Sequence, residues 1–423
     1  MPTTALREDM GIWFTCTPVR FKGDHTFFAR DSGLLCKGFQ EIGVACKAIM
    51  PGPPMEDDQV EDLIRTDYRN LEDPGWWETL GGEGVVFYGW GSGKYVKIVR
   101  AIKQAGLVLV SHMDTAGMLG VLNGFSTYAK TVWRVSRGEH RNGLAGLLHF
   151  AARLVYATSV GLIGNDRTRA RHLKQADWIG AITPVALERI RKVCRIYGGD
   201  FLAGRVQLVP HPNATCMVPD PSLPKERLVV GVGRWDDPYV KGTDLLLATA
   251  ERLLQQDAHV CFEIYGRMRE DMHGWHQNLP VAIRDRVKLM GVVRNSLVSQ
   301  ALQRARVEIC TSLRESYHIV SAEALCCGCS VVGPDVAEIP GMKWFTDGPF
   351  GRMAGRTADG MAEAVLAELA DWDAGRRSAE VIAAHWSVIL HAPQVAERIL
   401  QLAERQGEHS ANSLPTPLPG IDL

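Results

Sequence analysis

Short runs of apolar residues alternate with longer amphipathic stretches along most of the chain. The runs that are typical of buried strands lie at 10–17, 43–50, 107–112, 130–138, 205–213, 228–232, 259–267, 285–293, 307–310 and 330–332. Apolar positions at helical spacing fill several of the stretches between them, as at 25–43 and 317–327. Strands that alternate with helices predict βαβ units, and therefore an α/β fold built on parallel sheets.

One proline-rich segment interrupts this alternation. Residues 214–226, ATCMVPDPSLPKE, have the composition of a linker. A chain of 423 residues is long for a single core, so we expect two α/β domains, at 1–215 and 216–380. Beyond them we expect a helix at 381–405 and a disordered tail at 406–423, where the sequence is polar and rich in proline.

Two segments of the first half carry candidate features. Residues 51–82 are acidic and rich in Pro, Gly and Trp. We expect an irregular excursion with a short helix, in which the Trp76–Trp77 pair serves packing rather than stacking on a sugar. The segment from Gly89 to Lys94 is not a phosphate-binding P-loop, because Tyr88 and Tyr95 stand where that motif requires Gly and Ser or Thr. It predicts a glycine-rich turn between a strand and a helix.

Polar side chains follow the strand predicted at 107–112. His112 and Asp114 stand at its end, before a helix expected at 115–128. The carboxyl ends of parallel strands face the ligand crevice of such sheets, so both are candidates to line it. The next strand, predicted at 130–138, ends beside Arg137, which is a third candidate. A buried His112 that only supports its neighbours is the alternative.

The stretch 306–333 predicts a strand, a polar loop, a helix at 317–327 and a second strand. Glu315 precedes the helix and Glu323 lies on it, eight positions apart, which is too far for a compact metal site. They are placed to touch two ends of one extended ligand across the helix N-terminus, whose unpaired N–H groups favour phosphate. The alternative is an ordinary βαβ unit with two surface glutamates.

A second polar loop opens the second half. After the strand at 228–232 comes G-R-x6-K-G, with Arg234 and Lys241, and a helix from about 241 whose predicted inward side chains are Leu245, Leu246, Ala248 and Leu253. A lysine near a helix N-terminus opposes the helix dipole unless an anion is bound there. An exposed Arg and a lysine that only caps the helix are the alternative.

Composition narrows the function class only a little. The formal net charge is −1, which favours neither nucleic acid nor an acidic surface. No apolar run is long enough to span a bilayer, and the N-terminus lacks an apolar signal core, so a cytoplasmic protein is expected. Three of the ten cysteines, Cys326, Cys327 and Cys329, crowd together, but the second half that a zinc site needs is missing, which predicts buried thiols and no metal site. One basic run, 166–174, is expected to be a solvated face; the alternative is peripheral contact with anionic lipid or acceptor.

The motif S-x-x-E-S-x6-E-A-L-x-x-G-x-x-V-V at 312–332 resembles the E-x7-E motif of retaining glycosyltransferases of the GT-B fold, family 4. The resemblance implies that Glu315 lies by the donor sugar, that Glu323 holds the nucleotide ribose, and that the amides of Ile319 and Val320 hold the diphosphate. It also implies that Arg234 and Lys241 grip that diphosphate. His318 stands where the family usually has Gly, next to the donor.

The resemblance extends more loosely to the rest of the chain. It implies donor-binding turns at Gly233, Gly266 and Val292, and a cleft-facing loop at Gly23 in the N-terminal domain. It implies two Rossmann-like domains that face each other across a cleft, an acceptor-side domain and a nucleotide-sugar-binding domain. The last helix, 381–405, is expected to cross back to the first domain.

The implied activity is metal-independent transfer of a sugar, with retention, from a UDP- or GDP-linked donor to an acceptor hydroxyl in polysaccharide or glycoconjugate biosynthesis. No further cofactor is expected. The acceptor alternatives are a glycan and a lipid-linked molecule. Two other functions stay open: a nucleotide-sugar epimerase of the same fold, and a catalytically silent relative that binds nucleotide sugar.

Overall fold

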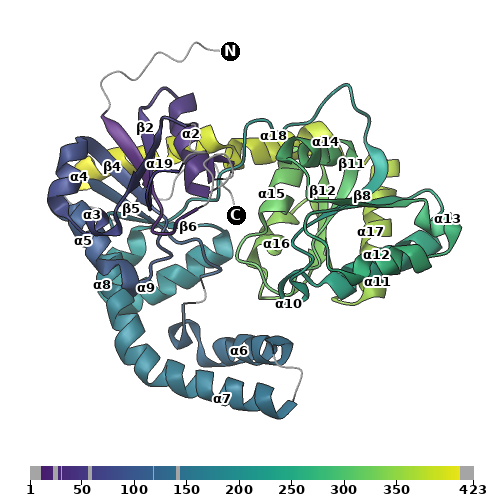
Figure 1. Cartoon of the computed structure of the whole chain (residues 1–423), viewed down its shortest axis with the longest axis horizontal. Coiled ribbons are helices and arrows are strands. Elements are labelled where there is room, and N and C mark those ends of the chain that lie inside the picture. The colour runs from purple at the N-terminus through teal and green to yellow at the C-terminus, as the bar shows by residue number, and fades with distance from the viewer. Residues whose placement is uncertain are drawn as a thin grey trace. The chain divides into compact units, whose positions relative to one another are not determined.

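We analysed a computed structural model of the 423-residue chain. The structure describes residues 11–21, 27–29, 31–55, 60–117, 119–139 and 143–409. The chain forms two compact units, which are treated one at a time (Figure 1). Unit 1 comprises Met1–Ala214 with Ala392–Leu423, and unit 2 comprises Thr215–His391.

Unit 1 is built on a seven-stranded sheet in the order β3-β2-β1-β4-β5-β6-β7. Every neighbouring pair is parallel. The strands are β1 (Ile12–Cys16), β2 (Cys46–Pro51), β3 (Leu63–Thr66), β4 (Gly82–Phe87), β5 (Val108–His112), β6 (Trp178–Ala181) and β7 (Val206–Leu208). The helical elements of this half are α2 (Asp31–Glu41), α3 (Tyr68–Leu71), α4 (Pro74–Leu80), η1 (Gly93–Tyr95), α5 (Val96–Gln104), η2 (Val121–Asn123), α6 (Phe125–Glu139), α7 (Gly143–Thr158), the π segment η3 (Gly161–Asp166), α8 (Arg167–Gln175) and α9 (Pro184–Gly204).

The prediction of a strand at 130–138 is wrong, because this segment belongs to the helix α6. Its buried side chains, Val132 and Ser136, are four residues apart, which is helical spacing. The prediction of a helix at 115–128 is also wrong for most of these residues. Gly117, Gly120 and Gly124 have positive φ values of 72°, 150° and 123°, and these turns delay α6 until residue 125.

The excursion at 51–82 holds more structure than predicted, namely the strand β3 and the helices α3 and α4. Trp77 is fully buried, and its Nε1 donates to the carbonyl of Leu71 at 3.0 Å. Trp76 packs edge-on against it, with ring centroids 5.0 Å apart. The packing interpretation of this pair is therefore confirmed.

The last helix, α19 (Ala392–His409), belongs to unit 1. Its apolar side chains are buried in the same cluster as those of β1 and α2, and they are Val395, Ala396, Ile399, Leu400 and Leu402. A Cβ added at Gly38 of α2 would lie 2.4 Å from the carbonyl oxygen of Ala392. The two helices thus approach closely where Gly38 has no side chain.

Unit 2 is built on a six-stranded sheet in the order β10-β9-β8-β11-β12-β13, again with every neighbouring pair parallel. Its strands are β8 (Glu226–Val232), β9 (Cys261–Tyr265), β10 (Val287–Gly291), β11 (Ala305–Ile309), β12 (Ser330–Pro334) and β13 (Gly351–Ala354). Its helices are α10 (Pro238–Lys241), α11 (Thr243–Gln256), α12 (Asp271–Asn278), α13 (Val281–Arg284), α14 (Asn295–Arg304), α15 (Ile319–Cys326), α16 (Pro340–Phe345), α17 (Ala358–Asp373) and α18 (Ala379–Leu390).

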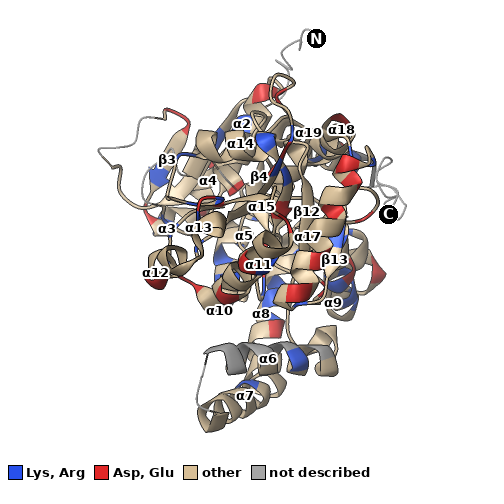
Figure 2. Ribbon diagram, turned by 90° about the vertical axis from the view of Figure 1, so that its right-hand side faces the viewer, with Lys and Arg blue, Asp and Glu red and all other residues tan. Residues whose placement is uncertain are grey.

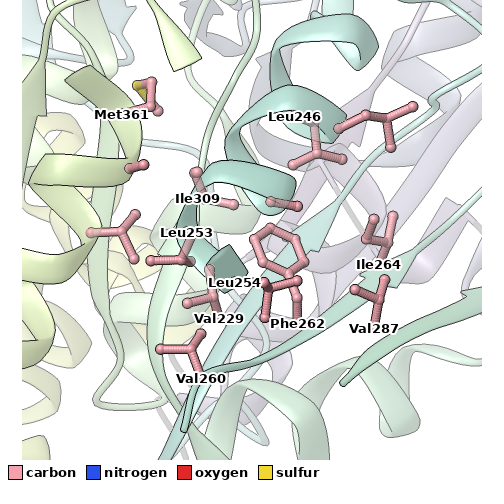
Figure 3. Packing of buried hydrophobic residues seen from close by; sticks show 14 of the residues in the cluster. Val229, Leu246, Leu253, Leu254, Val260, Phe262, Ile264, Val287, Ile309 and Met361 are labelled. Carbon is pink, nitrogen blue, oxygen red and sulfur yellow. The ribbon is translucent and has the colours of Figure 1, made fainter. Parts of the chain in front are cut away.

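The core of unit 2 gathers side chains of the sheet, α11 and α17 (Figure 3). Leu246, Leu253 and Leu254 of α11 pack there with Phe262 of β9 and Met361 of α17. Ala248 is exposed, so its predicted inward position is wrong; the buried stripe of α11 runs through residues 246, 250 and 253 instead.

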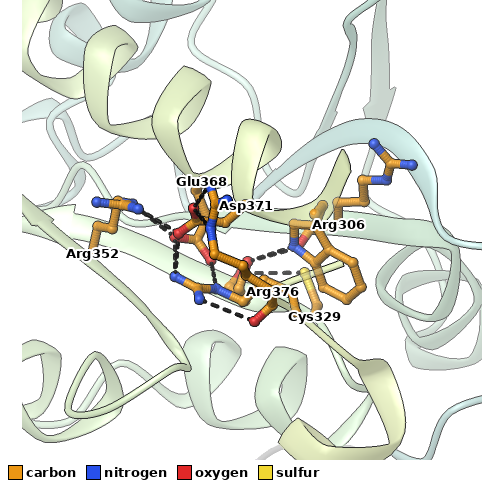
Figure 4. Close-up of polar contacts among 9 residues, drawn as sticks. Arg306, Cys329, Arg352, Glu368, Asp371 and Arg376 are labelled. Atoms are coloured by element: carbon orange, nitrogen blue, oxygen red, sulfur yellow. Dashed lines mark hydrogen bonds and ion pairs between the residues drawn. The ribbon is translucent and has the colours of Figure 1, made fainter. Parts of the chain in front are cut away.

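An ion-pair network ties the edge strand β13 to α17 and to the turn that follows it (Figure 4). Arg352 donates to Glu368 at 3.0 Å and also pairs with Asp371. Arg376 Nε donates to Asp371 at 2.6 Å. Glu368 is completely buried, and Arg377 Nη2 donates to it at 2.9 Å as well, so the network links the edge strand to the packed helix.

Eight of the ten cysteines are buried as predicted, but Cys216 and Cys261 are exposed. Cys261 is the first residue of β9, where the side chain lies outside the packed part of the sheet. Among the described helices, none combines the length and the apolar character that crossing a bilayer requires.

Candidate donor-binding site

The topology of unit 2 places two loops at one point of its sheet. The strand order reverses between β8 and β11, which are neighbours although they are far apart in sequence. In open parallel sheets, ligands bind beyond the carboxyl ends of the strands at such a reversal. The residues there are the 233–240 loop after β8 and the 310–318 loop after β11.

The loop after β8 is fixed by a buried tryptophan. Trp235 Nε1 donates to the carbonyl of Tyr265 at 2.8 Å, and its amide donates to the carbonyl of Arg267 at 2.7 Å. Gly233, just before it, donates to the same Tyr265 carbonyl at 3.0 Å. Arg234 lies between these two anchored residues and is exposed. The anchoring therefore presents its guanidinium to solvent.

Gly266 and Gly242 allow the loops at the strand ends to touch. Gly266 has φ of 108°, and a Cβ there would lie 1.9 Å from the carbonyl oxygen of Gly233. Gly242, with φ of 66°, would bring a Cβ to 2.1 Å from the carbonyl oxygen of Thr311. A side chain at either position would force backbone apart, so these glycines define the shape of the site.

Lys241 and Glu315 form an ion pair that joins the two loops. Ser312 donates to the same carboxylate at 3.2 Å. Two further hydrogen bonds connect the same segments: the Leu313 N–H donates to the carbonyl of Val240 at 2.7 Å, and the Thr311 hydroxyl donates to the carbonyl of Lys241 at 3.0 Å. Lys241 and Glu315 keep 15% and 18% of their side chains exposed, so both remain accessible to a ligand.

The charge of Glu315 is stabilised by its surroundings. Burial acts to raise the pKa of its carboxyl, but the neighbouring His318 and Lys241 and the hydrogen bonds outweigh burial and lower the pKa below its ordinary value. Glu315 is therefore an ionised carboxylate at neutral pH. A fixed carboxylate of this kind can accept hydrogen bonds from a hydroxyl-bearing ligand.

The helix α15 begins with a residue in an unusual backbone conformation. His318 has φ of 70° and ψ of 77°, which is the left-handed region that favours glycine. This turn starts the helix at Ile319, and the amide of Ser321 donates to the carbonyl of His318 at 3.1 Å. The N–H groups of Ile319 and Val320 are at the first two helical positions, which have no intrahelical acceptor.

A buried polar chain lies directly beneath this turn. The hydroxyl of Ser321 is 2.7 Å from Nδ1 of His318 and 2.7 Å from Oε2 of Glu308, a residue of β11. His318 is 5% exposed, and Glu308 is fully buried. Burial, and then the charge of Lys241, lower the pKa of His318 to about 4, so the ring is neutral at neutral pH. Burial raises the pKa of Glu308 to about 8.

Sequence reasoning missed Glu308 and Ser321. The available signal was a lone acidic residue inside the apolar run of β11. A buried carboxyl needs a partner, and here the partner comes from the helix that follows in the chain. Oε1 of Glu308 has no hydrogen-bond partner among the described atoms and lies 4.0 Å from Nδ1 of His318.

The other residues predicted to bind the donor lie in different parts of the structure. Glu323 lies on α15, four residues after Ile319 and therefore on the same face of the helix, and it is half-buried. Val292 is 77% exposed in the turn after β10, at the edge of the sheet. Gly23 lies outside the described residues. Among the contacts of the described side chains, none joins Arg234 to Lys241 or to α15.

In unit 1 the structure brings His112 and Asp114 together with a partner that was not predicted. His211, which follows β7, places Nε2 2.8 Å from Oδ1 of Asp114. Trp90 Nε1 donates to the other oxygen of Asp114 at 3.2 Å. His112 is fully buried and stacks on Tyr88 at 4.3 Å. These residues lie beyond the carboxyl ends of β4, β5 and β7, strands of one parallel sheet in which β6 separates β5 from β7.

Burial decides between the two interpretations of this cluster. Burial, and then His211, lower the pKa of His112 to about 3, so this ring stays neutral and packed and is placed to support its neighbours. Asp114 keeps 29% of its side chain exposed, and His211 holds its pKa well below the usual range against the effect of burial. Arg137 lies on α6 rather than at a strand end, so its predicted place beside these residues rested on the wrong strand.

Part of the chain matches known proteins in sequence. Residues 226–371 match the family model described as glycosyl transferases group 1. A segment of 137 residues is 30% identical to the phosphatidylinositol N-acetylglucosaminyltransferase gpi3 subunit of Schizosaccharomyces pombe, and it covers 32% of this chain and 30% of that protein. The chain thus matches about a third of the length of that relative.

Solved structures resemble the chain over nearly its whole length. One is the apo form of the lipopolysaccharide outer core galactosyltransferase WaaB, at 14% identity and a TM-score of 0.59, with 94% of this chain and 100% of that chain covered. Another is Alr3699/HepE of Anabaena in complex with UDP, at 12% identity and a TM-score of 0.58, with the same coverage. The chain therefore has the GT-B fold, and its residues 226–371 match the glycosyl transferases group 1 model.

Proposed function

We propose that the protein is a retaining glycosyltransferase that moves a sugar from a nucleoside-diphosphate sugar to an acceptor hydroxyl. One observation carries the proposal. The ion pair of Lys241 with Glu315 stands directly before the start of α15, at the strand-order reversal of a glycosyl transferases group 1 domain. A cation, a fixed carboxylate and helix amides are the groups that a sugar diphosphate would need there.

The diphosphate would bind at the start of α15. The amides of Ile319 and Val320 point out of the helix end, where the helix dipole favours negative charge. Lys241 lies beside this end, and Arg234 would reach the diphosphate from the loop after β8. Glu323, one turn further along α15, would accept hydrogen bonds from the ribose hydroxyls.

The chemistry would use these groups as charge stabilisers. In transfer with retention, the bond from the anomeric carbon to the diphosphate oxygen breaks, and the acceptor oxygen bonds to that carbon from the same face. The acceptor proton passes to an oxygen of the departing diphosphate. Lys241 and Arg234 would stabilise the charge that develops on the leaving group, which is the role a metal ion has in other transferases. Glu315 would position the donor sugar.

His318 would touch the donor from the side where relatives have no side chain. Nδ1 of His318 lies at hydrogen-bond distance from the Ser321 hydroxyl, which also contacts Glu308. This buried chain of contacts fixes the orientation of the imidazole ring. A ring fixed in this way would either contact the donor or narrow the space for it. Binding without turnover, as in a silent relative, is the outcome expected if it narrows the space too far.

Thermal shift with a panel of UDP- and GDP-linked sugars tests donor binding directly. UDP-N-acetylglucosamine is the first choice, because a relative is named for N-acetylglucosamine transfer and a similar structure contains UDP. A donor at about 100 times its dissociation constant adds about 2.7 kcal/mol of stability, which is easily measured. No shift with any nucleotide sugar would contradict the proposal.

Turnover then separates the proposal from its alternatives. With the bound donor, sugar transfer that depends on an added glycan or lipid-linked acceptor supports a transferase. Product formed from the donor alone would identify an epimerase, and binding without product would identify a silent relative. Glu315→Gln should bind the donor but lose about two orders of magnitude in turnover, since it removes a charge next to the reacting sugar. Glu363→Gln, on α17, is the matched control.

A further inference from the structure

One helix of unit 1 exposes a stripe of apolar side chains. In α7, Leu144, Leu147, Leu148 and Val155 are 66%, 49%, 62% and 66% exposed. Their spacing, i, i+3, i+4 and i+11, places them on one face of the helix, with the exposed Ala151 between them. Isolated exposed apolar residues are ordinary, but a contiguous stripe of this kind marks an interaction surface.

The other face of α7 is already occupied. Phe150 packs edge-on against Trp133 of α6, with centroids 5.1 Å apart, and His149 Nδ1 lies 3.1 Å from Ser136 Oγ of the same helix. Figure 1 shows α6 and α7 side by side as a hairpin that projects from the body of unit 1. The apolar stripe is therefore the outer face of a two-helix hairpin, and no described residue of the chain covers it.

Positive charge accompanies the stripe. Residues 119–175 contain nine Lys or Arg but only two Asp or Glu, in a chain whose overall net charge is −1. Helix α7 contains no acidic residue, and its ribbon is tan and blue in Figure 2. Beyond the π segment η3, Arg167, Arg171 and Lys174 of α8 are exposed. Arg169 differs from these three residues, because its guanidinium forms an ion pair with Asp166 at 2.6 Å and so has a structural role.

We propose that the α6–α7 hairpin, with the exposed basic side chains of α8, docks unit 1 onto an anionic lipid surface. A helix with an apolar face, combined with basic residues elsewhere in the same region, is the arrangement that inserts at the headgroup boundary of a bilayer. A second copy of the chain fits less well, because two segments of the same positive charge repel each other. Nucleic acid would match the charge but would leave the leucines exposed to water.

The test is flotation of the full-length protein with vesicles of phosphatidylcholine alone or with about one-third phosphatidylserine. We expect binding to the anionic vesicles that weakens at least tenfold in about 0.5 M salt. The double variant Leu148→Glu with Val155→Glu should reduce binding at least tenfold, and so should Arg167→Glu with Arg171→Glu. Val388→Glu, at a 63% exposed position on α18, is the matched control and should bind as the unchanged protein does.

Folding does not obscure the result, because the substituted side chains are exposed; each variant should melt within about 2 °C of the unchanged protein. Three outcomes would overturn the proposal. They are equal binding by the Leu148→Glu/Val155→Glu variant and the unchanged protein, a dimer in solution that this variant converts to monomer, and binding to polyglutamate but not to vesicles. The proposal does not depend on sugar transfer, since none of these readouts involves a nucleotide sugar.

Discussion

His318 shows at the scale of a single residue how the site combines strain with burial. Its left-handed backbone conformation costs a non-glycine residue about 1–2 kcal/mol, yet the ring is buried and bonded to Ser321. The helix α15 begins directly after this residue, so the strained turn orients the amides that would hold the diphosphate. Glycine, which the family that the motif resembles usually has here, adopts this backbone angle without strain.

Replacing His318 separates these two contributions. His318→Gly removes both the ring and the strain, whereas His318→Ala removes the ring and keeps the strain. We expect the Gly variant to be more stable than the Ala variant by about 1 kcal/mol, measured by urea unfolding. The Gly variant should retain or exceed the turnover of the unchanged protein. Complete loss of turnover in a folded Gly variant would show that the ring acts on the donor.

Glu308 gives a prediction about pH. Its pKa is raised by burial to about 8, so folding favours the protonated carboxyl. The stability that this provides is complete below the ordinary value of 4.5 and is lost as the pH rises to about 8. The Glu308→Gln variant cannot ionise at this position. The difference in unfolding free energy between the unchanged protein and this variant should therefore change by up to about 5 kcal/mol across this range.

The measurement is urea unfolding of both proteins at intervals from about pH 5 to pH 8.5. Glu315→Gln is a useful comparison, because the pKa of Glu315 is lowered and its contribution should be constant at these pH values. Parallel stability curves for the protein and its Glu308→Gln variant would mean that Glu308 is not held protonated.

Among the elements of unit 2, the loops that follow the strands need glycines where their backbones approach closely. The sequence predicts only part of the role of these glycines. Gly233 and Gly266 were predicted as turn residues beside the donor, but their direct backbone contact could not be predicted. It depends on β8 and β9 being neighbours in the sheet. Strands with strong apolar runs were predicted correctly, as at β5 and β11. The segment 130–138 failed because its valines satisfy both a strand and a helix pattern, and the packing of α6 on α7 decides between them.

Two glycines with positive φ provide a matched test of this contact. Gly266→Ala would place its Cβ 1.9 Å from the carbonyl oxygen of Gly233, whereas Gly291→Ala meets no atom within 4 Å. Gly291→Ala should cost only about 1 kcal/mol of backbone strain, and Gly266→Ala should cost at least about 2 kcal/mol more. Thermal unfolding of the two variants checks this. Equal melting temperatures would contradict the close approach of the two loops.

At the scale of the whole molecule, the chain forms unit 1 from two separate segments. The buried residues of α19 join the core of β1 and α2, although the whole of unit 2 lies between them in sequence. Sequence periodicity indicated a helix there, and only the family resemblance indicated where it belongs. The site was predictable in the same way: the motifs gave Glu315 and Lys241, but their pairing, and the chain from Glu308 to His318, required the fold.

Truncating one buried side chain of α19 measures what this helix contributes. Leu400→Ala should destabilise unit 1 by about 2–5 kcal/mol, because it leaves a cavity in the core. Val388→Ala, at an exposed position on α18, should change stability by less than about 0.5 kcal/mol. Calorimetric unfolding provides the comparison. A Leu400→Ala protein as stable as the control would place α19 outside the core of unit 1.

We propose that one diphosphate binds between Lys241, Arg234 and the start of α15. Titration calorimetry with UDP and GDP tests it most directly, on the unchanged protein and on Lys241→Ala, Arg234→Ala and the control Arg267→Ala, an exposed arginine of a neighbouring loop. Loss of a charge-assisted contact of about 1.5–3 kcal/mol should weaken binding of the preferred nucleotide about 10- to 100-fold in the first two variants. Arg267→Ala should bind as the unchanged protein does. Unaltered affinity in both Lys241→Ala and Arg234→Ala would contradict the account.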